Sequence, residues 1–333
     1  RTGEGSLFVV ARADFTGDEV FWDFVPSPEA QRLLVPFAES GEAPCVLAMV
    51  QYDIYPIVTD VPQVRRRGRG HRNAPLGDGR RRRIPVHPVL DVSPFHDRTL
   101  LRARSPPHVP FEHPVCSPSY LNGVPRPFVT RRYTVPHRLL AHINSSCAEK
   151  GASTYCAVTA HLWRAMCIAR GLPGDSDTRL RVSVYIRHLL RPPLPASYFG
   201  NATIRDLVTV KVGDVLSQPL GSVADRIKRA VSRVDDAFVR SVIDHLELDS
   251  EKGSQASRGL MPESDLWVAS WLGLPIYDAD FGWGRPGFVA PAQMQGSGTA
   301  YVTQVSDKED PVTVIFALEP DYLQCFEKAF YGE

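Results

Sequence analysis

The pentapeptide at residues 280–284, Asp-Phe-Gly-Trp-Gly, constrains the fold of this chain more than any other stretch. Glycine has no Cβ, so two glycines on either side of a tryptophan place backbone where no side chain fits. The acid in front of this loop adds a charge that needs a partner once it is packed. On composition alone the stretch is a glycine-rich turn after a strand. The complete string is far rarer than such a turn, so the rest of the chain must decide what it means.

The bulk composition predicts a soluble globular protein. The chain has 333 residues, of which 43% are hydrophobic and 23% charged, enough for about two domains. No apolar run approaches the ~18–20 residues of a membrane span. The sequence begins with neither a methionine nor the apolar core of a signal peptide, and we expect it to open within a domain. The six cysteines show no metal-ligand spacing, which favours reduced thiols in a cytoplasmic protein without a metal site.

Charge is distributed unevenly. Residues 65–83 contain nine arginines and a single acid, Asp78. The whole chain has 38 basic and 37 acidic side chains, so removing this segment leaves a net charge of −7. A nuclear-targeting or nucleic-acid patch is one interpretation of such a run. We favour a run without function, because neither interleaved aromatic residues nor a known nucleic-acid-binding motif accompanies it.

The hydrophobic pattern predicts mixed helices and strands. We expect a helix near 154–170, capped by Ser153 or Thr154, a second helix over about 222–247, and a short closing helix near 321–330. Residues 105–127 are rich in proline and turn formers, which indicates a long connection. Strands are expected at 7–13, 181–186, 207–212, 266–271, 300–305 and 312–318. Because strands and helices do not alternate strictly, and no GxGxxG or Walker loop occurs, we expect α/β layers rather than a nucleotide-binding domain.

Several strings together resemble the BAHD acyltransferases, plant enzymes that move an acyl group from coenzyme A to an alcohol or amine. The loop at 280–284 is similar to the DFGWG signature of that family. The segments PFHDRTLLRARSPP (94–107), STYCAVTAHLWRAMCIARGLP (153–173), RPPLPASYFGN (191–201) and EPDYLQCFEKAFYG (319–332) are similar to its hydroxycinnamoyl transferases. The resemblance covers nearly all of 94–333 and, more weakly, 1–51.

The resemblance implies a structural role for the DFGWG loop. In the family the aspartate of this loop pairs with an arginine and fixes the loop near the coenzyme A channel. The matching residues here are Asp280 and Arg187, with Phe281, Gly282, Trp283 and Gly284 completing the loop. A buried pair of this kind is costly to break on one side only. We therefore expect Asp280→Ala to lower thermal stability more than it changes the choice of acceptor.

The family's catalytic motif, HxxxDG, is expected in the first domain, where its histidine acts as general base on the acceptor. The chain contains a formal HxxxD match at His87 and Asp91. Its context does not fit, because no glycine follows Asp91, a proline follows His87, and the arginine run lies just before. We interpret it as a chance match in a loop.

A shift of reading frame explains the missing motif better. If residues 63–91 are read one base later, the codons permit a string that contains HHxxxDG in a context typical of the family. We therefore predict that 52–93 is a mistranslated stretch, caused by an insertion, a deletion or a mispredicted exon boundary. Sequencing the transcript tests this, because an uninterrupted frame identical to the present one would contradict it.

The acceptor is predicted from the segment before the strand at 266–271. Glu263 and Asp265 stand close to Trp271 in sequence, and carboxylates attract a polyamine cation but repel shikimate. The string MPESDLW also resembles agmatine or putrescine hydroxycinnamoyl transferases. A solvated acidic turn is the simpler alternative. We therefore expect an amine acceptor, with a shikimate- or quinate-type alcohol as the second choice.

These observations lead to one expectation for the molecule. The fold is the two-domain α/β fold of coenzyme A-dependent acyltransferases, similar to chloramphenicol acetyltransferase, with a truncated first domain. Residues 1–104 form the partial first domain, 105–127 the crossover loop and 128–333 the second domain. The resemblance implies an acyl-CoA co-substrate, a small-molecule amine or alcohol acceptor, no bound cofactor or metal, and no nucleic-acid or membrane partner. We expect a cytoplasmic monomer; the alternative is an inactive pseudogene product that lacks the catalytic motif.

Overall fold

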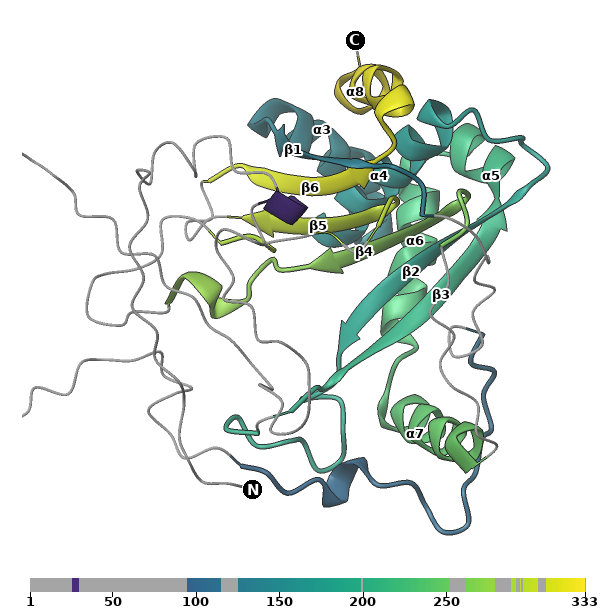
Figure 1. Cartoon of the computed structure of the whole chain (residues 1–333), viewed down its shortest axis with the longest axis vertical. Coiled ribbons are helices and arrows are strands. Elements are labelled where there is room, and N and C mark those ends of the chain that lie inside the picture. The colour runs from purple at the N-terminus through teal and green to yellow at the C-terminus, as the bar shows by residue number, and fades with distance from the viewer. Residues whose placement is uncertain are drawn as a thin grey trace, which may run out of the picture.

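The computed structural model describes residues 26–29, 95–114, 125–198, 200–251, 261–278, 289–291, 294, 296–304 and 310–332. Within this part of the chain a six-stranded sheet is packed against helices (Figure 1). The strands are β1 (Val129–Val135), β2 (Asp177–Tyr185), β3 (Thr203–Lys211), β4 (Asp265–Ser270), β5 (Thr299–Gln304) and β6 (Val312–Leu318). The α-helices are α3 (His137–Cys147), α4 (Thr154–Ala169), α5 (Val212–Ser217), α6 (Leu220–Ser232), α7 (Asp236–Glu251) and α8 (Leu323–Tyr331). Short 3-10 turns are η1 (Thr99–Leu101), η2 (Ala148–Lys150), η3 (Pro275–Asp278) and η4 (Pro320–Tyr322).

The sheet is mixed. Its strand order is β1-β6-β5-β4-β2-β3, which places β1 and β3 at the two edges. Neighbouring strands β2, β4 and β5 run parallel to one another, whereas β1, β6 and β3 pair antiparallel to their neighbours. The predicted strands at 181–186, 207–212, 266–271, 300–305 and 312–318 are confirmed as the five strands β2 to β6. The predicted strand at 7–13 lies outside the described residues.

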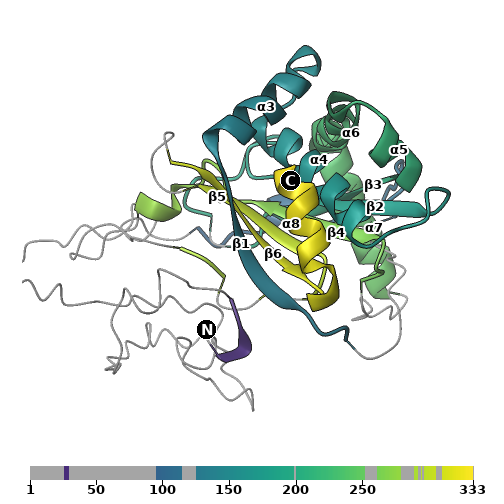
Figure 2. The ribbon, with the colours of Figure 1, turned by 90° about the horizontal axis from the view of Figure 1, so that it is seen from above.

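Helices α3, α4, α5 and α6 lie together on one side of the sheet (Figure 2). The core sits between them and the sheet because alternate strand residues point the same way. On β4, for example, Leu266 and Val268 are fully buried in this core, whereas Trp267 and Ala269 on the other face are half-buried. The sheet therefore has one apolar face under the helices. No described α-helix lies on its other face, here named the helix-free face, which carries polar and aromatic side chains.

The predicted helix near 154–170 is confirmed as α4, which is buried along most of its length. Ser153 caps its start, because its hydroxyl oxygen accepts a hydrogen bond from the backbone N–H of Cys156. The indole of Trp163 is fully buried and donates to the hydroxyl of Thr178 on β2 over 2.8 Å. His161, which is half-buried, contacts the carbonyl oxygen of Phe330 in α8 at 2.7 Å through a ring nitrogen.

The prediction of one helix over 222–247 is wrong, since the structure has two helices there, α6 and α7. The apolar period continues through the break, but two polar side chains redirect the backbone. Arg233 forms an ion pair with the buried carboxylate of Asp206 on β3. Asp235 accepts a hydrogen bond from the backbone N–H of Phe238 at 2.8 Å, which starts a new helix.

The connection predicted at 105–127 contains no helix or strand in its described residues, 105–114 and 125–127. Its beginning is fastened to α7. Arg104 and His108 donate hydrogen bonds to the carboxylate of Asp244, and His113 contacts the hydroxyl of Ser241 at 2.8 Å. The domain boundaries around this connection stay a prediction. Strand β1 and helix α3, which follow the connection, were not expected from the sequence.

Candidate active site

Three parallel strands, β2, β4 and β5, end at the same edge of the sheet. In open α/β sheets, ligands bind beyond the carboxyl ends of such strands. Arg187 follows β2 at this edge, and Trp271 follows β4. The register, with Val182 opposite Val268, puts Tyr185 level with Trp271. The structure therefore brings Arg187 and Trp271, two of the residues singled out in the sequence, to one edge.

The guanidinium of Arg187 is held by two aromatic rings and two backbone carbonyl groups. Its guanidinium carbon lies 5.4 Å from the ring centre of Tyr185 and 5.3 Å from that of Tyr198. It donates hydrogen bonds to the carbonyl oxygens of Tyr198 and Gly200. A Cβ on Gly200 would approach the Tyr198 hydroxyl to 2.6 Å, so this close contact requires glycine. The buried Nε of Arg187 has no hydrogen-bond partner among the described residues, which leaves one donor open.

The DFGWG loop at 280–284 lies outside the described residues. The pairing of Asp280 with Arg187 therefore stays a prediction, and the open Nε of Arg187 is compatible with it. His87 and Asp91, the formal match to the catalytic motif, also lie outside the described part. The described part of the candidate site is therefore the edge of the sheet at which β2, β4 and β5 end.

Trp271 forms an aromatic pair at this edge. Its ring meets that of Tyr301 on β5 with centres 4.9 Å apart and planes inclined by 62°. Its backbone N–H donates to the carbonyl oxygen of Val302 at 2.8 Å, which fixes the start of the following turn. Both rings are half-buried, so they present apolar surface of the kind that packs against a planar group.

The structure separates the three predicted acceptor residues. Glu263 and Asp265 lie at the amino end of β4, whereas Trp271 follows its carboxyl end. Since a strand rises ~3.3 Å per residue, about 20 Å of extended chain lie between Asp265 and Trp271. The assignment of these three residues to the acceptor site stays a prediction, and the structure places the two carboxylates and the tryptophan at opposite ends of β4. Closeness in sequence does not survive in a strand, whose two ends point to opposite edges of the sheet.

Asp265 links two strands of the sheet, β4 and β2. Its carboxylate is fully buried and forms ion pairs with Arg179 at 2.8 Å and Arg181 at 3.0 Å, both on the neighbouring strand β2. The buried acid is thus neutralised by two guanidinium groups, as a buried charge requires. It has no negative charge to offer to a polyamine.

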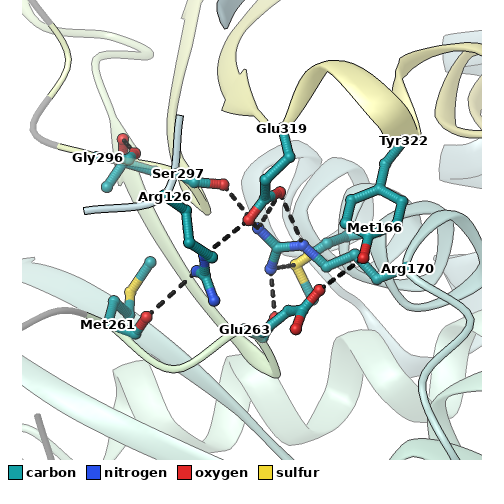
Figure 3. A network of polar contacts seen from close by, with 10 residues as sticks. Arg126, Met166, Arg170, Met261, Glu263, Gly296, Ser297, Glu319 and Tyr322 are labelled. Atoms are coloured by element: carbon teal, nitrogen blue, oxygen red, sulfur yellow. Dashed lines mark hydrogen bonds and ion pairs between the residues drawn. The ribbon is translucent and has the colours of Figure 1, made fainter. Parts of the chain in front are cut away.

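Glu263 belongs to a polar network centred on Arg170, the residue that follows α4 (Figure 3). The fully buried guanidinium of Arg170 forms an ion pair with Glu319 at 2.9 Å and donates to the hydroxyl of Ser297 at 2.8 Å. It also donates to the carbonyl oxygen of Glu263, whose carboxylate accepts from Tyr322 at 2.9 Å. This network ties together the segments before β4, before β5 and after β6.

Arg126 joins the same network from the end of the crossover segment. It forms an ion pair with Glu319 at 2.8 Å and donates to the carbonyl oxygen of Met261. Burial alone would raise the pKa of Glu319, but the charge of Arg170 and hydrogen bonds from Arg170 and Ser297 outweigh burial and lower that pKa. Glu319 therefore remains a carboxylate and joins the second domain to the segment that leads into it.

Sequence reasoning missed four residues of the helix-free face: Arg205, Ser183, Trp267 and Tyr301. They stand on four different strands, so no spacing along the chain reveals that they are neighbours. The only available signal was the alternation within each strand, which puts every second residue on this face. Among the described residues, no group of three acidic, histidine or cysteine side chains could hold a metal ion. None of the described helices is long and apolar enough to cross a membrane.

Solved structures with the same fold identify the class. The chain is similar to F. graminearum TRI101 complexed with coenzyme A and deoxynivalenol, with a TM-score of 0.58 and 16% identity, over 68% of this chain and 54% of that chain. It is also similar to vinorine synthase, with a TM-score of 0.51 and 18% identity, over 63% of this chain and 48% of that chain. The chain thus has the two-domain α/β fold of these proteins, and its match spans about half the length of each.

Sequence comparisons identify the family. The sequence model of the Transferase family matches residues 87–332. A protein of Oryza sativa subsp. japonica named putrescine hydroxycinnamoyltransferase 1 is 39% identical over 361 residues, covering 100% of this chain and 79% of that protein. Shikimate O-hydroxycinnamoyltransferase of Nicotiana tabacum is 30% identical over 359 residues, covering 99% of this chain and 80% of that protein. The chain belongs to the Transferase family, which is the BAHD family of acyl-CoA-dependent acyltransferases.

Proposed function

We propose that this protein, with an intact first domain, transfers a hydroxycinnamoyl group from a coenzyme A thioester to the amino group of a small amine. The observation that carries this proposal is the 39% identity, over the whole chain, to a protein named putrescine hydroxycinnamoyltransferase. Other relatives support the acyl group: hydroxycinnamoyltransferase of Narcissus pseudonarcissus is 32% identical over 99% of this chain. The acyl-CoA is a co-substrate, and the reaction requires no bound cofactor.

The chemistry is that of aminolysis. The amine nitrogen attacks the thioester carbonyl carbon, a C–N bond forms and the C–S bond breaks. The nitrogen gives up a proton to a general base, and the leaving thiolate of coenzyme A takes up a proton. A histidine suits this base because its neutral imidazole is available near pH 7. The thioester is already activated, so no metal is needed to polarise it.

The described residues provide binding surface and support rather than the base. Trp271 and Tyr301 offer aromatic surface at the carboxyl edge of the parallel strands, which suits the planar ring of a hydroxycinnamoyl group. Arg187 keeps a donor open for the loop at 280–284 that follows β4 and η3. We assign Arg187 a positioning role, because two of its other N–H groups already donate to backbone carbonyl groups.

The general base is missing from the chain as written. The family match begins at residue 87, directly after the arginine-rich segment at 65–83. This limit supports an out-of-frame reading for the part of 52–93 that lies before residue 87, where the intact gene would carry HxxxDG; residues 87–93 fall inside the match. A chain made as printed is then inactive, which is the alternative function class.

The choice of an amine acceptor now rests on the relatives alone. The carboxylates that first suggested a polyamine lie at the wrong end of β4, and Asp265 is neutralised by two arginines. An alcohol that bears a carboxylate is the second candidate. The exposed cation of Arg205 on the helix-free face favours it, and tobacco shikimate O-hydroxycinnamoyltransferase is also among the relatives.

An acceptor assay with a frame-corrected chain tests the proposal. Coumaroyl-CoA is offered with putrescine, agmatine, tyramine and shikimate in parallel, and product is measured by mass. We expect amides from at least one of the three amines. Turnover of shikimate alone would replace the amine by the alcohol, and no turnover with any acceptor would contradict acyl transfer of this type.

We further propose that the protein acts as a cytoplasmic monomer without a membrane or nucleic-acid partner. Light scattering on the purified chain measures its mass directly, and a mass of two chains would contradict the monomer. Retention on DNA that weakens with salt would assign the arginine-rich segment to nucleic-acid binding instead.

A further inference from the structure

The helix-free face of the sheet carries a row of polar side chains across four strands. Arg205 on β3 lies opposite Ser183 on β2. The registers of β2 with β4, and of β4 with β5, extend this row through Ala269 to Tyr301. Ala269, at the centre, contributes only a methyl group and is half-buried, so the longer side chains on both sides can reach over it.

Arg205 is exposed, and its guanidinium lies over an aromatic ring. Its central carbon lies 4.6 Å from the ring centre of Trp267, which stands one step further along the same face. The indole of Trp267 is fixed in turn, because its Nε1 donates to the hydroxyl oxygen of Ser183 at 3.0 Å. A guanidinium held over an indole by a cation–π contact still has its N–H groups available, and a carboxylate or phosphate can accept two of them.

This arginine differs from the other arginines of the face. Arg179 and Arg181 are both paired with Asp265. Arg205 forms no ion pair or hydrogen bond with another of the described residues, and its guanidinium lies over the ring of Trp267. A positive charge that is oriented by an aromatic ring and has no acid beside it is complementary to an anion from solution.

Two hydroxyl groups stand near this charge. Ser183 accepts from Trp267 and so keeps its own proton to donate. Burial raises the pKa of Tyr301, and the nearby charge of Arg205 lowers it, with burial the stronger effect. The phenol is therefore protonated at neutral pH and can also donate. Its ring is held in place by Trp271.

We propose that Arg205, Ser183 and Tyr301, supported by Trp267, form a subsite that binds an oxyanion of a substrate. The subsite deepens the proposed function and rests on it for the two sources of the oxyanion. One source is a phosphate of the coenzyme A donor, and the other is the carboxylate of the second-candidate acceptor, a shikimate- or quinate-type alcohol. Both would use the same edge of the Arg205 guanidinium, with hydrogen bonds from the two hydroxyl groups.

Binding measurements on the whole chain test this without requiring turnover. Calorimetric titrations with coenzyme A, dephospho-coenzyme A and shikimate are compared for the parent, Arg205→Gln and Arg205→Lys. A charge-assisted hydrogen bond is worth ~1.5–3 kcal/mol, so Arg205→Gln should weaken the responsible ligand by roughly 10- to 100-fold. Arg205→Lys should recover only part of the loss, since an ammonium lacks the planar fork.

The ligand whose affinity falls in Arg205→Gln distinguishes the two sources of the oxyanion. If the 3′-phosphate is bound, the effect is large for coenzyme A and small for dephospho-coenzyme A. If the pyrophosphate is bound, both coenzymes lose affinity, and if an acceptor carboxylate is bound, only shikimate does. Tyr301→Phe, which removes one hydroxyl and nothing else, should reduce affinity for the same ligand.

Arg229→Gln is the matched control, because Arg229 is an exposed arginine on α6 with an ordinary ion pair to Asp225. It should bind every ligand as the parent does. Unchanged binding by Arg205→Gln while the parent binds coenzyme A would overturn the subsite and leave the proposed function intact. A parent that binds none of the three ligands would overturn the subsite and count against the proposed function as well.

Discussion

At the scale of single residues, the pair of Arg170 and Glu319 decides the stability of the second domain. The Arg170 side chain is fully buried, and that of Glu319 is 9% exposed. Removing one partner leaves the other as an uncompensated buried charge, which costs ~3–5 kcal/mol. We therefore expect Glu319→Gln to lower the free energy of unfolding by about 3 kcal/mol, measured by urea denaturation.

Asp177→Asn is the matched control for this substitution. It also removes a carboxylate from an ion pair, with Lys211, but both side chains are more than half exposed. Exposed pairs contribute little because water already solvates both charges. We expect no measurable change in stability for Asp177→Asn. An equal decrease in the free energy of unfolding of both variants would contradict a larger stabilising contribution from the buried pair.

The same glutamate gives the stability a dependence on pH. The folded-state pKa of Glu319 lies below its ordinary value of 4.5. Its stabilising contribution is therefore complete above the unfolded-state pKa and is lost as pH falls through the folded-state pKa. Urea denaturation between about pH 6 and about pH 3 should show the parent losing more stability than Glu319→Gln. Parallel pH curves for the two proteins would contradict the assignment.

At the scale of elements, the break between α6 and α7 depends on Asp235. Its side chain satisfies the backbone N–H of Phe238, and its carbonyl oxygen accepts from Val239 at 2.9 Å. Loss of an N-cap acid costs ~1 kcal/mol. We expect Asp235→Ala to lower the melting temperature by a few degrees, about what 1 kcal/mol amounts to at this size. Asp225→Ala, within α6, removes only a half-buried carboxylate whose ion pair with Arg229 is of the weak i,i+4 kind, and should leave it nearly unchanged.

Elements with a strong apolar period were predictable, and those without one were not. The alternation at 312–318 and the capped helix at 154–170 show their burial in the sequence itself. Strand β1 does not, because Arg131, Arg132 and Thr134 interrupt its apolar residues at the edge of the sheet, where β6 is its one neighbour among the described strands. The break before α7 was missed for the opposite reason, since a continuous stripe concealed a capping acid.

The candidate site was less predictable than the fold, because it is made of residues that meet across strands. Arg187 and Trp271 were found from motifs, and the parallel register of β2 with β4 brings them to one edge. The separation of Glu263 and Asp265 from Trp271 was not predicted, because closeness in sequence does not show that a strand places residues at opposite edges of a sheet. Arg205 could not be identified from the sequence, because the feature that distinguishes it is its contact with Trp267, 62 positions further along the chain.

At the scale of the whole molecule, the described sheet belongs to the predicted second domain, and the predicted first domain should determine whether chemistry occurs. The described sheet, its helices and the edge with Arg187 and Trp271 all fall after residue 128. The general base of the family is expected before residue 93, in the stretch that we propose is out of frame. A chain as printed should therefore still fold its second domain, and yet it should transfer acyl groups slowly at best.

The last prediction compares the printed chain with a frame-corrected chain under the same coumaroyl-CoA assay. A positioned general base contributes ~10²–10⁴ in rate, so the corrected chain should be faster by that order. Replacing the histidine of the restored HxxxDG by alanine should return the corrected chain to the rate of the printed one. In the printed chain His87→Ala should change nothing, because His87 is a chance match. If that substitution abolished measurable turnover, His87 would be the base, and the chain would be an enzyme as written.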